Sequence, residues 1–175
     1  MPPLEPDGKR VVWQVRPARA ADWPAIEATR FAAISSPIGP ALSAREQAAW
    51  LTMPMTDLRA VIGISEGACV VGEAQCASTG VAGYAWASAG ARPHLRALYV
   101  EPGARRQGLG SFLLHAVERQ LFEQGARELF VAAAPGAVDF YRHCGYAVDC
   151  EFTLPLRDDE GPVALRLRKM WKRLA

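Results

Sequence analysis

Cysteine and histidine are scarce in this sequence, with four cysteines and three histidines among 175 residues. The cysteines, at positions 69, 76, 144 and 150, form no C-x-x-C pair, and their spacing matches no common zinc pattern. We therefore expect reduced thiols and no metal site built by the protein. Apolar runs are short as well, and none approaches the ~20 residues that a membrane-spanning helix needs.

Net charge is also nearly absent, because 20 Lys and Arg face 18 Asp and Glu and leave a sum of +2. This balance argues against a dedicated nucleic-acid or membrane-surface protein, whose basic residues form a net patch. Residues 1–10 lack the order of a signal peptide, and proline and glycine interrupt every period in them. We expect a flexible leader over residues 1–10, a single domain over residues 11–175, and a cytoplasmic location.

The first quarter of the chain carries signals for one strand and two helices. Residues 11–15 form a short apolar run that predicts a strand. Asp22 can cap a helix that has Pro24 in its first turn, where the missing N–H costs nothing. Ser43 and Glu46 have the spacing of a capping box and predict a second helix.

After residues 56–65, which suit a short helix slightly better than a strand, the hydrophobic period changes to two. Residues 69–75 and 81–89 predict an antiparallel hairpin. In its second strand Tyr84 and Trp86 share one face, and the other face carries only glycine and alanine. A face of such small residues allows close approach of a helix or of a ligand.

A βαβ unit is predicted in the middle of the chain. Residues 94–100 and 128–133 read as strands, and an amphipathic helix begins near Leu109 and ends before Gly125. A short helix over residues 135–144 and two final strands should follow. We expect an α/β (α+β) fold: a mixed, mostly antiparallel sheet of about six or seven strands with a central parallel βαβ unit and helices on both faces.

The segment RRQGLGS, residues 105–111, lies between a predicted strand and the first turn of the amphipathic helix. First-turn N–H groups lack partners, glycines give an anion access to them, and flanking arginines add positive charge. The segment therefore suits a phosphate or pyrophosphate. Its spacing fits neither the Walker A motif nor the dinucleotide fingerprint. The alternative is a helix start that glycine merely makes easier, with solvated arginines.

The same residues match the pattern [RQ]-x-x-G-x-[GA], and AVDFYRHCGY, residues 137–146, matches A-x-x-F-Y-x-x-x-G-[FY]. In this order, with a predicted strand between them, the two motifs resemble motifs A and B of the GNAT superfamily of acyl-CoA-dependent N-acetyltransferases. The strong part of the resemblance covers residues 94–148. It implies one GNAT domain over residues 11–175 that transfers an acetyl group from acetyl-CoA to a primary amine by direct attack in a ternary complex.

The resemblance also implies which residues bind this cosubstrate. The backbone of Leu98, Tyr99 and Val100 would pair with the pantetheine arm like an extra strand. Backbone amides of the glycine loop would hold the pyrophosphate, and these belong to Arg105, Arg106, Gln107, Gly108, Leu109, Gly110 and Ser111. The strands that carry Val100 and Val131 would splay apart, with the thioester in the gap.

Tyr141 would be the general acid toward the departing CoA thiolate. A thiol pKa near 8.5 and a phenol pKa near 10 leave this proton transfer uphill by ~1.5 units, or ~2 kcal/mol, so the site must tune one group or use a water. His94, where relatives often have glutamate, is the expected base for the amine. Glu73 and water are the alternatives. His115 should be solvated, and Cys144 is not expected to act as a nucleophile.

One feature departs from many relatives, which carry Asn or Ser just after the strand that precedes motif B. This chain has alanine at positions 132–134, and it contains no asparagine at all. The departure favours an alternative reading, a catalytically weak or inactive acyl-CoA-binding regulatory module.

The acceptor amine is not identified by the sequence. An apolar wall for it could come from Phe31, Ile38, Trp50, Met53, Tyr84 and Trp86. Acetyl-CoA and this amine are the expected partners, without nucleic acid or membrane, and the C-terminal strands offer an edge for a homodimer.

Overall fold

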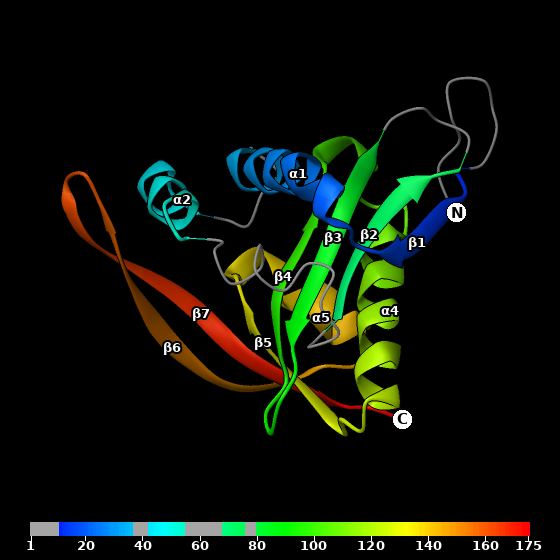
Figure 1. Ribbon diagram of the computed structural model, residues 1–175. Helices are drawn as coiled ribbons and strands as arrows, with labels where there is room; N and C mark the ends of the chain where they lie inside the picture. Colours follow the sequence, from blue (N-terminus) through cyan, green and yellow to red (C-terminus); the bar gives the residue numbers. More distant parts are fainter. Residues whose placement is uncertain (1–10, 37–41, 55–67, 76–79) are drawn as a thin grey trace.

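The computed structural model describes residues 11–36, 42–54, 68–75 and 80–175. Its middle layer is a seven-stranded sheet with the strand order β1-β2-β3-β4-β5-β7-β6. Helices α1 and α2 cover one face, and α4 and α5 cover the other (Figure 1). The β4–β5 pair is parallel, and the other neighbours in this sheet are antiparallel. The predicted fold class, with helices on both faces of a mostly antiparallel sheet, is confirmed.

The first three strands form an antiparallel meander of β1 (Trp13–Pro17), β2 (Ala68–Ala74) and β3 (Val81–Ser88). The predicted hairpin of β2 and β3 is confirmed by their pairing. Strand β1 begins two residues later than predicted. The leader and the ambiguous segment 56–65 lie outside the described residues.

Helix α2 (Ala44–Leu51) has the predicted capping box. The Glu46 amide donates to the Ser43 hydroxyl at 3.3 Å, and the Ser43 amide donates to the Glu46 carboxylate at 2.8 Å. In α1 (Trp23–Ser35), Asp22 holds the N-cap position, but its side chain makes no bond to the helix.

The Asp22 carboxylate instead accepts two bonds from Arg16, at 2.8 and 2.9 Å, and one from the Arg19 amide at 2.7 Å. The prediction that Asp22 caps α1 through its side chain is therefore wrong. A forked, charge-assisted pair is stronger than a hydrogen bond from a neutral helix amide, so the Asp22 carboxylate pairs with Arg16.

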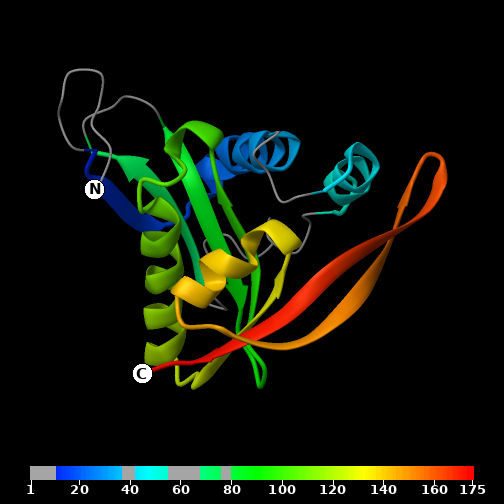
Figure 2. The ribbon, with the colours of Figure 1, turned by 180° about the vertical axis from the view of Figure 1, so that it is seen from behind.

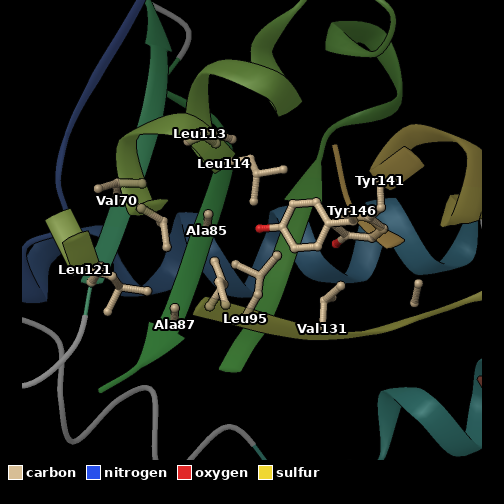
Figure 3. Close-up of a cluster of buried hydrophobic side chains, with 14 of the residues drawn as sticks. Val70, Ala85, Ala87, Leu95, Leu113, Leu114, Leu121, Val131, Tyr141 and Tyr146 are labelled. Carbon is tan, nitrogen blue, oxygen red and sulfur yellow. The ribbon is translucent and has the colours of Figure 1, made fainter. Parts of the chain in front are cut away.

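Helix α4 (Leu109–Glu123) packs closely on β2, β3 and β4. A side chain at Gly72 would collide with Leu109, and a Cβ at Gly83 would lie 3.0 Å from a methyl carbon of Leu113. The small-residue face thus receives a helix, which settles the choice between helix and ligand. Figure 3 shows the resulting core, with strand residues facing leucines of α4, among them Val70, Ala85, Ala87, Leu95, Leu113, Leu114 and Leu121.

The C-terminal third contains β5 (Glu128–Ala133), α5 (Val138–His143), β6 (Ala147–Asp158) and β7 (Gly161–Arg173). Strand β7 lies between β5 and β6, and the long β6–β7 hairpin projects past the rest of the sheet (Figure 2).

The buried Glu118 carboxylate of α4 ties these elements together. It accepts from the Tyr146 hydroxyl at 2.9 Å and from the Lys172 ammonium at 2.8 Å. Helix α4 is thereby fastened both to β7 and to the chain that follows α5. No helix in the described part of the chain has the length and apolar character to span a membrane.

Candidate functional site

Strand β4 (His94–Val100) separates from β5 after two residues. The parallel pairing consists of His94 with Phe130 and Leu95 with Val131. Against β3 the register moves from Leu95 to Ala97, so Arg96 is an extra, bulged residue. A bulge bends a strand and ends its pairing. Beyond Arg96, β4 therefore has an edge that β5 does not cover, as the resemblance implies.

Two residues of β4 direct their backbone groups to this open edge. The Glu101 amide donates to the Ala82 carbonyl at 2.9 Å, which makes Val100 and its β3 partner a pair without mutual hydrogen bonds. By alternation, the N–H and C=O groups of Leu98 and Val100 face away from β3. Those of Tyr99 point toward β3, so only Leu98 and Val100 remain of the three residues predicted to pair along the edge.

The glycine loop follows directly. Gly108, at φ +84°, is the N-cap of α4, and its carbonyl accepts the first helical bond from Phe112 at 3.1 Å. The amides of Leu109, Gly110 and Ser111 are therefore in the first turn, where no acceptor exists within the helix. Glycine adopts this left-handed backbone without the strain of a side chain. A neighbour, Arg106, also has positive φ, at +57°.

The two loop arginines differ. The Arg105 guanidinium turns inward and donates to the Val100 carbonyl at 3.3 Å and to the Ala33 carbonyl of α1 at 2.7 Å. Burial lowers the pKa of Arg105. The Arg106 side chain is exposed on the loop. Carbonyls engage the Arg105 side chain, so of the two predicted flanking charges only that of Arg106 faces solvent at the loop.

Side chains around the loop fix its shape. The Gln107 side-chain amide donates to the Gly103 carbonyl at 2.7 Å, and the Trp13 indole donates to the Gln107 carbonyl at 2.9 Å. A Cβ at Gly110 would lie 3.4 Å from the Phe140 ring, so the start of α4 packs directly on α5. The segments of the two predicted motifs therefore meet in space.

Tyr141 lies on α5 and is 6% exposed. Its ring meets Phe140 and Tyr146 edge to face, at centroid distances of 5.1 and 5.5 Å. Figure 3 shows Tyr141 and Tyr146 side by side. Burial raises the pKa of Tyr141, and the nearby Tyr99 and Cys144 raise it further. The hydroxyl of Tyr141 therefore stays protonated at neutral pH, whereas that of Tyr146 is held by Glu118.

The candidate bases occupy different places. His94 lies two residues before the bulge, and its ring stacks on Phe130 at 5.5 Å. Its Nδ1 is 2.9 Å from the Arg92 carbonyl, which can only accept, so the lone pair of neutral His94 is on Nε2. Glu73 lies on β2, two strands or roughly 10 Å from β4, and its carboxylate pairs with Arg16. This ion pair favours His94 over Glu73 as the candidate base.

The remaining predicted residues are scattered. His115 is exposed on α4, as expected. The proposed acceptor wall is only partly assembled: Tyr84 is fully buried beneath α1, whereas Phe31 is 62% exposed. Trp50 packs against Ala134, Leu165 and Leu167. Ile38 lies outside the described residues. Across the described ranges, no three His, Cys, Asp or Glu side chains gather to hold a metal ion.

One further residue had no signal in the sequence. Arg30 of α1 donates to the carbonyl groups of Trp50 and Met53, at 2.6 and 3.3 Å. A single arginine in a helix is indistinguishable by spacing from a solvated one, so only the fold reveals its position.

Comparison with known proteins agrees with this geometry. The family model described as Acetyltransferase (GNAT) family matches residues 27–146. A GCN5-related N-acetyltransferase from Rhodopseudomonas palustris is 24% identical, with a TM-score of 0.75 over 92% of this chain and 95% of that one. A phosphinothricin acetyltransferase from Sinorhizobium meliloti, in complex with acetyl-CoA, is 22% identical, with a TM-score of 0.71 over 93% and 89%.

The PaiA N-acetyltransferase from Thermoplasma acidophilum, in complex with coenzyme A, is 16% identical, with a TM-score of 0.71 over 93% of this chain and 99% of that one. No curated protein sequence matches the chain. At these identities the solved structures establish the fold. The family model, which spans more than half of the residues, establishes that the chain belongs to the GNAT family of acetyltransferases.

Proposed function

We propose that this protein transfers the acetyl group of acetyl-CoA to a primary amine, by direct attack within a ternary complex. The observation that carries the proposal is the continuity of two features. The open edge of β4 leads directly into a glycine loop with an unpaired helix N-terminus. An extended ligand with amides along one part and a diphosphate at one end complements both. Similar folds in complex with acetyl-CoA and coenzyme A support this choice.

The N–H and C=O groups of Leu98 and the N–H of Val100 would bind the pantetheine amides as an added strand, and the Val100 carbonyl would keep its bond from Arg105. The pyrophosphate would lie at the N-terminus of α4, where backbone amides and the helix dipole favour an anion. Arg106 would add charge from the loop, and Arg105 would hold the loop in place. The thioester would then lie beside the bulge at Arg96, in the opening between β4 and β5.

The reaction needs two proton transfers. The neutral amine attacks the thioester carbonyl carbon, a C–N bond forms, and the C–S bond breaks. The proton of the attacking amine would pass to Nε2 of His94 through water, and the departing thiolate would take a proton from the Tyr141 hydroxyl or from water. The products are an N-acetyl amide and the free thiol of CoA. The proton on Nε2 of His94 then passes to solvent and the Tyr141 phenolate, where it forms, regains one from solvent, so the atoms and protons balance.

Burial affects both partners of the second transfer. It raises the pKa of Tyr141, which weakens it as an acid. It raises the pKa of a thiol in the same way, as Cys69 shows with a pKa of about 12. A CoA thiolate forming in the same desolvated opening is therefore more basic than in water. Desolvation of the thiolate would therefore offset the weaker acidity of Tyr141.

A covalent acyl-enzyme is not part of the proposal. Cys144 is the nearest thiol to Tyr141 along the chain, but its sulfur lies 4.0 Å from the Ser111 hydroxyl, at the start of α4. Burial also raises the pKa of Cys144, which lowers its thiolate fraction. Replacement of Cys144 by alanine should leave turnover intact.

The test has two stages. Thermal unfolding is first measured with acetyl-CoA, and with ATP and NAD as controls. At 100 times the dissociation constant, binding adds ~2.7 kcal/mol of stability, which is a shift of several degrees. Turnover is then measured with a panel of amines for the wild type and for Tyr141→Phe. The variant should keep the thermal shift and lose most of kcat.

A thermal shift with no turnover of any amine would favour the alternative, an acyl-CoA-binding regulatory module. The alanines at the end of β5, which offer no polar side chain, favour that alternative. Absence of a shift with every CoA ester, in protein shown to be folded, would refute both.

A further inference from the structure

Arg30 is a half-buried cation whose hydrogen-bond partners among the described residues are neutral carbonyl groups. Its guanidinium donates to the carbonyl groups of Trp50 at 2.6 Å, Leu51 at 3.3 Å and Met53 at 3.3 Å, at the C-terminal end of α2. Within the described ranges, no carboxylate lies at ion-pair distance from it. A guanidinium has five N–H donors, so these three bonds leave donors over. A partly desolvated charge without a counter-ion is unfavourable.

Aromatic side chains with hydrogen-bond donors lie on one side of this cation. The Tyr99 hydroxyl lies beside the side chains of Arg30 and Trp50. The Tyr84 ring is 5.6 Å from the Tyr99 ring. Tyr84 is fully buried, and neither its hydroxyl nor the Trp86 indole N–H has a hydrogen-bond partner among the described residues. Arg30, Trp50 and Tyr99 are called the donor cluster below, and Tyr84 and Trp86 lie behind it in the core.

The composition of the donor cluster points to the charge of its ligand. Guanidinium and indole groups only donate, and a phenol donates as well as accepts. An unsatisfied buried donor destabilises the fold, and an incoming acceptor would relieve this cost. The nearby carboxylate of Asp22 is already bonded to Arg16. The donor cluster therefore complements an anion and repels a second cation.

The donor cluster also lies at the opening between β4 and β5, on the α1 face. Tyr99 belongs to β4, on the near side. Trp50 packs with Ala134 and Leu165 on the far side, and its indole lies beside Tyr99, so it spans the opening. Tyr99 belongs to the part of β4 beyond the bulge, where β5 no longer pairs and where the thioester is proposed to lie. A group bound here would therefore be near the proposed reacting centre.

We propose that the donor cluster binds a carboxylate of the acceptor, and that the acceptor is a small amine with a carboxylate a few bonds from its amino group, as in an α-amino acid. The inference rests on the proposed function. The α2 carbonyls hold the Arg30 fork in one orientation, which prepares it for a planar carboxylate. A polyamine would bring a second positive charge against Arg30, and the N-terminus of a protein would bring no carboxylate.

The direct test compares amino acids with their own primary amides. Each pair has the same side chain, and the amide has the less basic amine, so its neutral fraction is larger at neutral pH. Chemistry alone therefore favours the amide. We expect the acids to have the higher kcat/KM, by roughly 10–100-fold, since hydrogen bonds to a charged group contribute about 1.5–3 kcal/mol.

Two variants connect this preference to the donor cluster. Tyr99→Phe removes only a hydroxyl and Arg30→Gln removes the cation. Both should lower kcat/KM for the acids by about tenfold or more. Both should lower kcat/KM for the amides by less, because an amide oxygen accepts a hydrogen bond but carries no charge. Because Arg30 also holds α2, Arg30→Gln can lower stability, and Tyr99→Phe keeps the test decisive. The thermal shift with acetyl-CoA is measured for both, and it should equal that of the wild type.

Equal kcat/KM for acids and amides would overturn the inference and leave the proposed function standing. If both variants still prefer acids to amides as strongly as the wild type does, the inference is also overturned and the proposed function stands. A thermal shift with acetyl-CoA, combined with turnover of carboxylate-free amines alone or of no amine, would also overturn it. Absence of a thermal shift with acetyl-CoA in the wild type would refute the proposed function.

Discussion

Two glycines at opposite ends of α4 provide a matched test of the glycine loop. Gly108 precedes the helix with φ +84°, and Gly125 follows it with φ +97°. A Cβ on Gly108 would come no closer than 3.8 Å to another side chain, that of Phe112, and one on Gly125 would meet nothing within 4 Å. Substitution by alanine therefore imposes left-handed strain at both positions and a steric clash at neither.

The expected loss of stability is the same for Gly108→Ala and Gly125→Ala. A left-handed backbone costs a residue with a side chain about 1–2 kcal/mol. For a chain of this size each kcal/mol lowers the melting temperature by roughly 2–4 °C. The two variants should thus melt about 2–8 °C below the wild type, and close to one another.

Binding of acetyl-CoA should separate the two variants. The new methyl group of Gly108→Ala stands at the N-cap of α4, beside the amides that would hold the pyrophosphate. Loss of one charge-assisted hydrogen bond costs about 1.5–3 kcal/mol, or roughly 10–100-fold in affinity. Gly125→Ala changes the far end of the helix and should bind as the wild type does.

The assay is titration calorimetry with acetyl-CoA at a temperature where all three proteins are folded, with melting curves in parallel. If Gly108→Ala binds as tightly as Gly125→Ala, the loop is not the pyrophosphate site. If the melting temperatures of Gly108→Ala and Gly125→Ala differ by more than about 8 °C, the two substitutions do not impose equal strain. The reasoning that attributes a difference in affinity to the loop alone is then wrong.

Three other predictions follow from ionisable groups. Because burial raises the pKa of Tyr141, the wild type should show no alkaline fall in kcat up to about pH 9 from this group; a pH–rate profile with Tyr141→Phe as control checks this. The Arg16 guanidinium holds the pKa of Asp22 below its usual 3.8, so this stabilisation is complete above that value and lost as pH falls through the lowered pKa. Melting curves of Asp22→Asn should depend less on acid pH. Burial raises the pKa of Cys69 to about 12, whereas Cys150 is exposed, so a thiol reagent should label Cys150 in the folded protein and Cys69 only after unfolding, by peptide mass spectrometry.

The strands and helices near the site could be predicted because local residues delimit them. Strand β4 and strand β5 have the predicted bounds, and α4 begins at the predicted Leu109 after a glycine. The apolar run predicts that strand β1 begins two residues too early, because such a run does not reveal where its partner strand lies. The Trp13–Ala74 pair, between residues far apart in the chain, sets the start of β1.

The backbone part of the site was also predictable, but the directions of long side chains were not. Glycine spacing located the loop, since glycine's backbone freedom is a local property. The sequence makes Glu73 a candidate base, but Arg16 of the neighbouring strand β1 forms an ion pair with its carboxylate. Whether a charged side chain meets solvent, an ion or a carbonyl depends on elements that are remote in sequence, and periodicity carries no information about them.

The two inward-turned arginines have a shared consequence for the site. Arg105 bonds the Ala33 carbonyl, and Arg30, one turn earlier on α1, bonds the carbonyls at the end of α2. The Arg105 guanidinium thus joins the glycine loop to α1, and the Arg30 guanidinium joins α1 to α2, in both cases by hydrogen bonds to backbone carbonyl groups. A lysine at either position would keep the charge but lose the fork, because its ammonium lacks the planar array of donors. Geometry rather than net charge therefore sets the position of the glycine loop relative to the donor cluster.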